Sequence, residues 1–78
     1  MKWILTKDQL PDKQDEYLVA WLPMKKKLRD RRKGKCFLEI CEFEPDGNGW
    51  ITNQSQMTAY GGAEIMAWAV LPECVVEE

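Results

Sequence analysis

The sequence predicts a mainly β fold: a small antiparallel sheet or partly closed barrel of about four strands with a long basic hairpin loop. Short apolar runs that end at proline or glycine are typical of strands. The 4 tryptophans in 78 residues provide large side chains for a core that a chain of this size can only make thin. A dense group of basic residues interrupts the strand pattern and predicts a solvated connection between two strands.

The first 16 residues contain a short apolar piece, Trp3–Leu5, followed by turn-forming residues up to Pro11, which favours extended backbone at Leu10. The first clear strand follows at Tyr17–Leu22, where the apolar run stops at Pro23. Both faces of this strand are apolar, so we expect both to be covered. Its two sets of side chains are Tyr17, Val19 and Trp21 on one face and Leu18, Ala20 and Leu22 on the other.

Residues Lys25 to Lys35, here called the basic segment, hold eight of the 11 basic residues and only one acidic residue, Asp30. The segment therefore carries a formal charge of +7, and the rest of the chain, with three basic and 12 acidic residues, carries −9. Because it lacks an apolar stripe at helical spacing and ends near Gly34, we expect a loop. The candidate binding residues are Lys25, Lys26, Lys27, Arg29, Arg31, Arg32, Lys33 and Lys35.

The second strand is expected at Cys36–Glu44, buried on both sides at its start, where Leu38 and Ile40 lie, and more exposed at its end. The turn Pro45–Gly49 combines proline with Asp, Asn and Gly, which tolerate the backbone of tight turns. We therefore expect Trp50–Asn53 to pair back on the second strand as a hairpin.

The remaining chain begins with Gln54–Gly62, which is polar, carries a Gly-Gly break and predicts a loop. Ala63–Leu71 is compatible with a helix, because it is rich in alanine, or with a strand bounded by glycine and proline. The residues favour the strand. The acidic tail, 73–78, is expected to be flexible.

The length of 78 residues predicts a single domain, 1–78. The sequence contains no signal-peptide pattern and no apolar run long enough for a membrane span, so we expect no membrane contact and a cytoplasmic location with reduced thiols. Cys36, Cys41 and Cys74 lack a fourth obvious ligand, so we expect no metal and no cofactor. The alternative is a structural zinc shared across a dimer.

Catalytic chemistry has few candidates in this chain. Histidine, the commonest general acid or base, is absent. Cys36 follows Lys35, which is a weak signal for an activated thiol, and the glycines near residues 47 and 61 lack the motif of a phosphate loop. We therefore expect no enzyme and no catalytic residue.

The chain contains a series of short motifs: Trp3-Ile4, Asp8-Gln9-Leu10-Pro11, Tyr17-Leu18-Val19-Ala20-Trp21, Gly49-Trp50 and Ile65-Met66-Ala67-Trp68-Ala69-Val70-Leu71-Pro72. Together they resemble a family of unknown function that is common in bacteriophages and prophages. The chain differs at Ala67 and Val70, where the family often has His and Pro, and its basic segment is longer than usual. The resemblance implies a phage origin, a bacterial host cell and a small β fold, implies no mechanism, and favours a strand for residues 64–71.

These observations predict a non-enzymatic phage accessory protein that binds a host macromolecule, such as an anti-defence (anti-CRISPR) inhibitor of a host protein. The alternative is a nucleic-acid-binding module that acts through the basic segment. An acidic ribbon of Glu39, Glu42, Glu44 and Asp46 is a second candidate contact surface, for a host protein's DNA-binding groove. Because two strands are apolar on both faces, either the sheet curls into a small barrel or a second copy covers one face, and we expect a homodimer.

Overall fold

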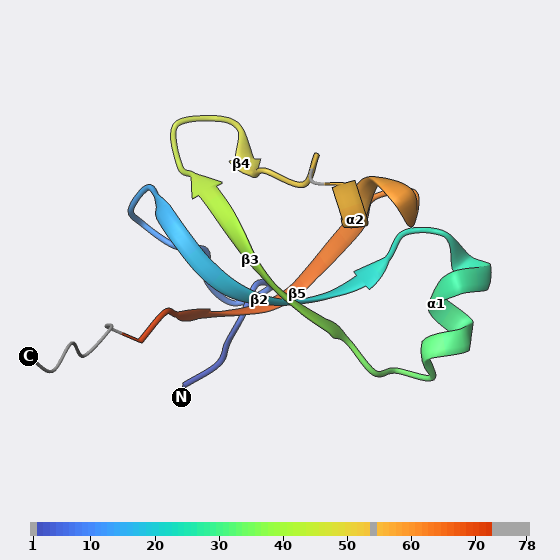
Figure 1. Cartoon of the computed structure of the whole chain (residues 1–78). Coiled ribbons are helices and arrows are strands. Elements are labelled where there is room, and N and C mark those ends of the chain that lie inside the picture. The colour runs from blue at the N-terminus through green and yellow to red at the C-terminus, as the bar shows by residue number, and fades with distance from the viewer. Residues whose placement is uncertain (1, 54, 73–78) are drawn as a thin grey trace, which may run out of the picture.

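The computed structural model describes residues 2–53 and 55–72, which form one antiparallel sheet in the order β1-β5-β2-β3-β4. Figure 1 shows this sheet curled, so that β2, β3 and β5 overlap in this view near the middle of the molecule. The mainly β fold predicted from the sequence is confirmed. The strands are β1 (Ile4–Leu5), β2 (Asp15–Pro23), β3 (Phe37–Glu44), β4 (Gly49–Trp50) and β5 (Ala63–Val70), and the helices are α1 (Lys26–Arg32) and α2 (Ser55–Ala59).

β2 lies at the centre of the sheet and pairs with β3 on one side and β5 on the other. Its pairing with β3 runs without a break from Asp15 opposite Phe43 to Trp21 opposite Phe37. Its pairing with β5 shifts between Ala20 and Trp21, an irregularity that bends a strand and increases its twist. The central strand therefore carries the curvature that gives the sheet an inner face.

The inner face holds the hydrophobic core. Tyr17, Val19 and Trp21 of β2 are all buried there, as their shared parity predicts. Trp21 is 0% exposed, stacks on Phe37 with ring centroids 4.7 Å apart, and lies edge-on to Tyr60 at 6.0 Å. The other core residues are Cys41, Phe43, Met57, Ile65 and Trp68.

The tryptophans divide between core and surface. Trp68 is buried and its Nε1–H donates a hydrogen bond of 2.9 Å to the carbonyl oxygen of Gln9, which ties the N-terminal loop to β5. Trp50 is half-buried against Tyr17 and Phe43, whereas Trp3 is 40% exposed. The expected role of the tryptophans in the core holds for Trp21 and Trp68 and not for Trp3.

The outer face differs from the sequence-based expectation at the start of β3. Leu38 is 63% exposed and Ile40 is 50% exposed, so the prediction that β3 is buried on both sides at its start is wrong. On β2, by contrast, Leu18 and Ala20 are half-buried and Leu22 is buried. Among the described residues, Leu38 and Ile40 have β2 as a neighbouring strand on one side and no strand on the other side. Their outer side chains therefore lie in solvent.

Two elements of the fold are absent from the sequence-based prediction. Trp3–Leu5 contributes a short fifth strand, β1, whose Ile4 lies opposite Trp68. The segment predicted as a loop at Gln54–Gly62 contains α2, and Met57 of this helix is 0% exposed in the core. A helix of five residues is too short to show an apolar periodicity in its sequence.

The hairpin from β3 to β4 is confirmed, although it is shorter than predicted. Phe43 pairs with Trp50 and Glu44 with Gly49, and the amide of Ile51 donates to the carbonyl of Glu42 at 2.9 Å. Gly49 has a φ of 63°, a left-handed conformation that glycine adopts without strain. The predicted flexible tail, 73–78, lies outside the described residues, and with it Cys74.

Candidate macromolecule-binding surface

The basic segment forms a helix, so its prediction as a loop is wrong. α1 covers Lys26–Arg32, and its end is closed by Lys33 in a left-handed conformation whose amide donates to the carbonyl of Asp30 at 3.2 Å. Lys and Arg have high intrinsic helix propensity, although a helix of seven residues is marginal in water by itself. Contacts with the sheet must therefore hold it.

Two arginines make those contacts. Arg29 forms an ion pair and hydrogen bond with Glu64 of β5. The guanidinium of Arg32 lies 3.8 Å from the centre of the Phe37 ring, and its nitrogens donate to the carbonyls of Lys35 at 3.1 Å and Cys36 at 3.4 Å. The Arg29–Glu64 contact joins residues 35 positions apart, and the Arg32–Phe37 contact joins α1 to β3, which explains why α1 forms without an apolar stripe.

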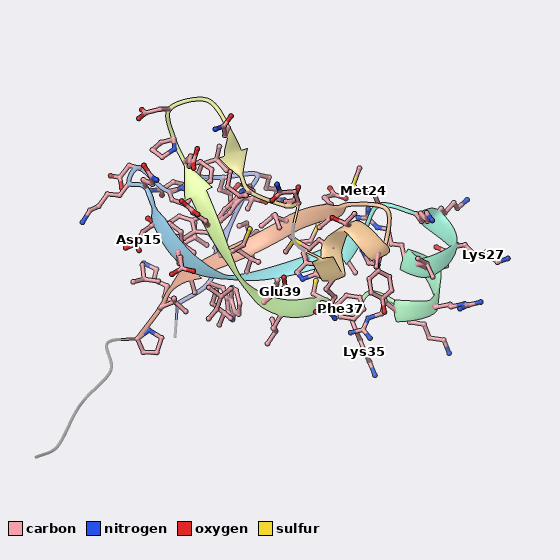
Figure 2. The ribbon with its side chains drawn as sticks, turned by 45° about the horizontal axis from the view of Figure 1, so that its top comes forward. Asp15, Met24, Lys27, Lys35, Phe37 and Glu39 are labelled. Atoms are coloured by element: carbon pink, nitrogen blue, oxygen red, sulfur yellow. The ribbon has the colours of Figure 1, made fainter. Side chains whose placement is uncertain are left out.

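The other basic side chains are exposed and form no ion pair within residues 2–53 and 55–72, where the Arg29–Glu64 bridge is the only one. Figure 1 shows α1 at one end of the molecule, beyond the ends of β2 and β3. In Figure 2 the side chains of Lys27 and Lys35 extend from that end, away from the sheet. The six exposed cations without an acidic partner are Lys25, Lys26, Lys27, Arg31, Lys33 and Lys35.

Lys25 also has a packing role at the base of α1. The Cβ that an alanine would place at Gly61 lies 2.7 Å from Lys25 Cγ and 2.9 Å from Lys25 Cε, so the aliphatic part of the lysine occupies the space beside this glycine. Gly61 has a φ of 78°, in the left-handed region. The turn before β5 and the start of the basic segment are thus in contact.

The expected acidic ribbon is not one surface. Glu39 has the inner-face parity of Phe37 and Cys41, whereas Glu42 and Glu44 have the opposite parity. Glu42 accepts a hydrogen bond of 3.3 Å from Gln14 Nε2, and Glu44 one of 2.7 Å from Asn48 Nδ2.

The start of β2 adds acidic residues that the sequence reasoning missed. Asp15 lies opposite Phe43, and Glu16 lies directly opposite Glu42. The β2–β3 pair therefore has an acidic end near Asp15 and a basic end at α1, and the labelled Asp15 and Lys27 stand at opposite ends in Figure 2. The acidic end becomes visible only from the pairing of β2 with β3, which the positions of the acidic residues in the sequence do not reveal.

The cysteines offer no activated nucleophile among the described residues. Cys41 is 1% exposed, and burial, followed by the nearby charge of Glu39, raises the pKa of its thiol from 9.0 to about 11. The thiol is therefore protonated at neutral pH, in the form that is a poor nucleophile. Cys36 is half-buried, and no cluster of three metal-ligating side chains occurs in the described part of the chain.

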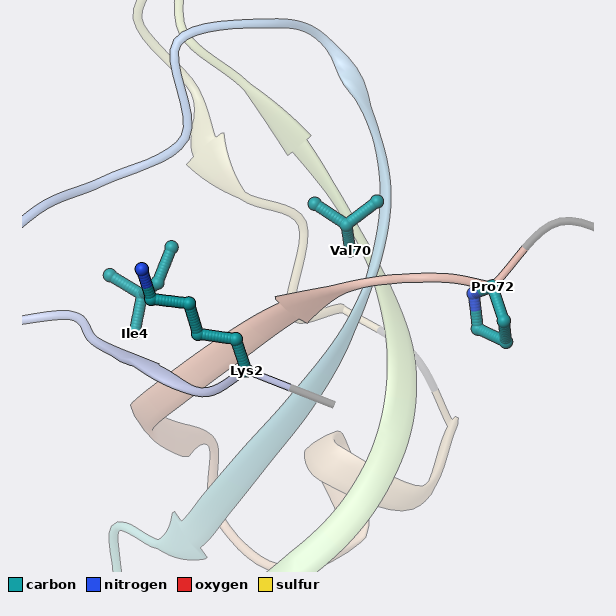
Figure 3. Close-up of a pocket in the computed structure, with 4 residues that line it drawn as sticks. All are labelled: Lys2, Ile4, Val70 and Pro72. Atoms are coloured by element: carbon teal, nitrogen blue, oxygen red, sulfur yellow. The ribbon is translucent and has the colours of Figure 1, made fainter.

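Two of the open depressions on the described part of the surface are large enough to consider as ligand sites. The larger, of about 510 Å³, is lined by Lys2, Ile4, Val70 and Pro72 (Figure 3), so one ammonium group faces three apolar side chains. The smaller lies between β1 and β5 near Thr6 and Glu64. Neither lining brings together a pair of groups with the geometry of an acid and a base within hydrogen-bond reach.

Comparison of the chain with models of protein families, with curated proteins and with solved structures finds no match. In the described part of the chain, neither helix has the length and apolar character needed to cross a membrane.

Proposed function

We propose that this chain is a non-enzymatic accessory protein of a bacteriophage that binds a host macromolecule through the basic segment. The observation that carries the proposal is the group of six exposed cations without acidic partners, which lie on and directly beside a short helix at one end of the sheet. Clustered charge of this kind speeds encounter with an oppositely charged surface. The phage context rests on the motifs at Trp3-Ile4 and Trp68–Pro72.

An acidic host protein is the partner that these features favour. The basic segment contains no aromatic residue on which a base could stack, and the Phe37 ring that follows it is stacked on the buried Trp21 and lies under the Arg32 guanidinium. The rest of the chain carries −9 and would repel a phosphate backbone that extends beyond α1. Inhibition of a host defence protein, as an anti-CRISPR protein does, is the role we assign within this class.

The test is a pair of variants that remove the same charge from different places. Lys26, Lys27 and Lys35 are changed to Gln in one variant, and Lys2, Lys7 and Lys13 in the other, so both lose three lysines. Gln preserves helix propensity. We expect a bacterial protein captured from nuclease-treated lysate by the unchanged chain to be lost with the first variant and retained with the second. Equal capture by all three proteins contradicts the proposal.

Nucleic acid is the second candidate, because six free cations could neutralise several phosphates. Mobility shifts with mixed DNA and RNA at about 50 mM and about 200 mM salt separate the two candidates, since phosphate binding weakens steeply over that range. A shift at the lower salt that disappears with the Lys26/Lys27/Lys35 variant favours nucleic acid. Absence of a shift at the lower salt excludes it.

A further inference from the structure

β3 has an open outer edge. The carbonyl of Glu42 accepts from Ile51 on the side of β3 that faces away from β2. Because the hydrogen-bonding direction alternates along a strand, the amides and carbonyls of Ile40 and Leu38 face the same way. β4 pairs only with Phe43 and Glu44, and no described segment forms a backbone hydrogen bond with Leu38 or Ile40 on this side.

The same two residues carry exposed apolar side chains, with Leu38 63% and Ile40 50% exposed. Natural sheets protect such an edge with lysine, proline, a bulge or a covering segment. Between Cys36 and Cys41 the edge contains no lysine, no proline and no bulge, and its only charged residue is Glu39. The unsatisfied backbone and the exposed side chains thus coincide, which is the pattern of an edge that accepts another strand.

The charge distribution identifies the strand that fits. β3 begins beside the basic segment, and it ends at Glu42 and Glu44 beside the acidic start of β2. When the β3 strands of two copies run antiparallel, the basic end of the second copy lies next to the acidic end of the first. The acidic end of the second copy then lies next to the basic end of the first. Such a surface is complementary to itself under a two-fold axis, as the interface of a symmetric dimer must be.

We propose that two copies of this chain dimerise by antiparallel pairing of their β3 edges, which joins the two sheets into one. Leu38 lies opposite Leu38 of the second copy, and Ile40 lies opposite Cys36 of the second copy. In this register Glu39 faces Phe37 of the second copy, where Arg32 sits 3.8 Å above the ring. In the alternative register, Leu38 lies opposite Ile40 of the second copy, and Glu39 then lies opposite Glu39 of the second copy. The repulsion between these two like charges disfavours this register.

The first experiment measures the association of the full chain by sedimentation velocity from micromolar to near-millimolar concentration. We expect a monomer–dimer equilibrium and a dissociation constant that Leu38→Lys raises by roughly 30-fold or more, as for the central residue of an interface. The matched control is Val70→Lys, because Val70 is also a strand residue and is 68% exposed. A chain that stays monomeric throughout, or variants that act alike, overturns the proposal.

The second experiment tests the register with charge reversal. Glu39→Lys and Arg32→Glu each place like charges at both copies of the contact, so each variant alone is expected to be mostly monomeric. Mixed, they restore opposite charge at both contacts, and a heterodimer should form with an affinity near that of the unchanged chain. Circular dichroism of each variant verifies that it is folded. Two folded variants that do not associate when mixed overturn the assigned register, and dimers of each variant alone overturn the interface.

Discussion

The inner face of the sheet and the basic segment are held in place by different kinds of contact. Every core residue of the inner face is at most 8% exposed, and aromatic rings pack on one another there. α1 buries no residue and is held by one ion pair, one cation–π contact and a left-handed cap. Stability and the proposed binding therefore depend on separate residues, so each can be altered while the other is preserved.

The largest effect is expected in the core. Trp21→Ala should lower the free energy of unfolding by about 3–5 kcal/mol, because it leaves a cavity where a fully buried ring was. Since small domains have about 5–15 kcal/mol in total, the variant should be close to unfolded. Urea denaturation followed by circular dichroism measures this, with Trp3→Ala, at an exposed position, as the control. Equal losses for the two would contradict the assignment of the core.

A second effect of the core depends on pH. The raised pKa of Cys41 keeps its thiol neutral in the folded chain up to about pH 11, whereas the unfolded thiol ionises at a lower pH, near 9.0. The contribution of Cys41 to stability is therefore complete below about pH 8 and is lost as the pH rises through 9 toward 11. Urea midpoints across this range should fall for the unchanged chain and fall less for Cys41→Ala.

Tyr17 adds to the same trend. Burial, and then the charges of Asp15 and Asp12, raises the pKa of its hydroxyl, so its contribution is also lost as the pH rises. For that reason Cys41→Ala is expected to retain part of the slope. An unchanged slope in this variant would show that the Cys41 thiol is not responsible.

An intermediate effect is expected where the two regions meet. Gly61→Ala forces a left-handed alanine, at a cost of about 1–2 kcal/mol, and also pushes its Cβ against Lys25. Gly34→Ala is the control, since Gly34 has a φ of 82° but no atom within 4 Å of the added Cβ. Urea denaturation should show the larger loss at Gly61, and the excess should disappear when Lys25 is also changed to Ala. Equal losses would mean that Lys25 moves aside freely.

The smallest effect is expected in the basic segment. Arg29→Ala or Glu64→Gln removes a partly exposed ion pair, so global stability should change by only about 0.2–1 kcal/mol. Amide exchange should instead accelerate within α1, for example at the Arg29 amide that bonds to the carbonyl of Lys25. If the urea midpoint moved as far as in Trp21→Ala, the division between the two regions would be wrong.

Local signals were sufficient for β2, β5 and the β3–β4 hairpin, but not for β1. The apolar runs at Tyr17–Leu22 and Ala63–Leu71 end at proline, and the turn at Pro45–Gly49 contains residues that few other structures prefer. Each of these signals lies inside the element that it predicts or directly after it. The positions of β2, β5 and the β3–β4 hairpin could therefore be read from short stretches of sequence.

The remaining features depend on contacts between distant residues. α1 is fixed by Arg29 with Glu64, 35 positions away, and α2 by the insertion of Met57 into a core formed by other elements. The exposure of Leu38 and Ile40 follows from the position of β3 near the edge of the sheet, which its own apolar pattern does not encode. Likewise the positions of the eight cations were evident from the sequence, but the sequence did not show which of them would form an ion pair.

The stacking of Arg32 on Phe37, and of Phe37 on Trp21, links the solvent-facing helix to the most deeply buried indole of the chain. A ligand that draws Arg32 away from this column would alter the polarity around Trp21 without touching it. The emission of that single indole would then change in wavelength or intensity as α1 engages its target. Trp21 fluorescence can therefore report on binding by α1. A variant with Trp3→Phe, Trp50→Phe and Trp68→Phe would retain Trp21 as its only tryptophan and so isolate this emission.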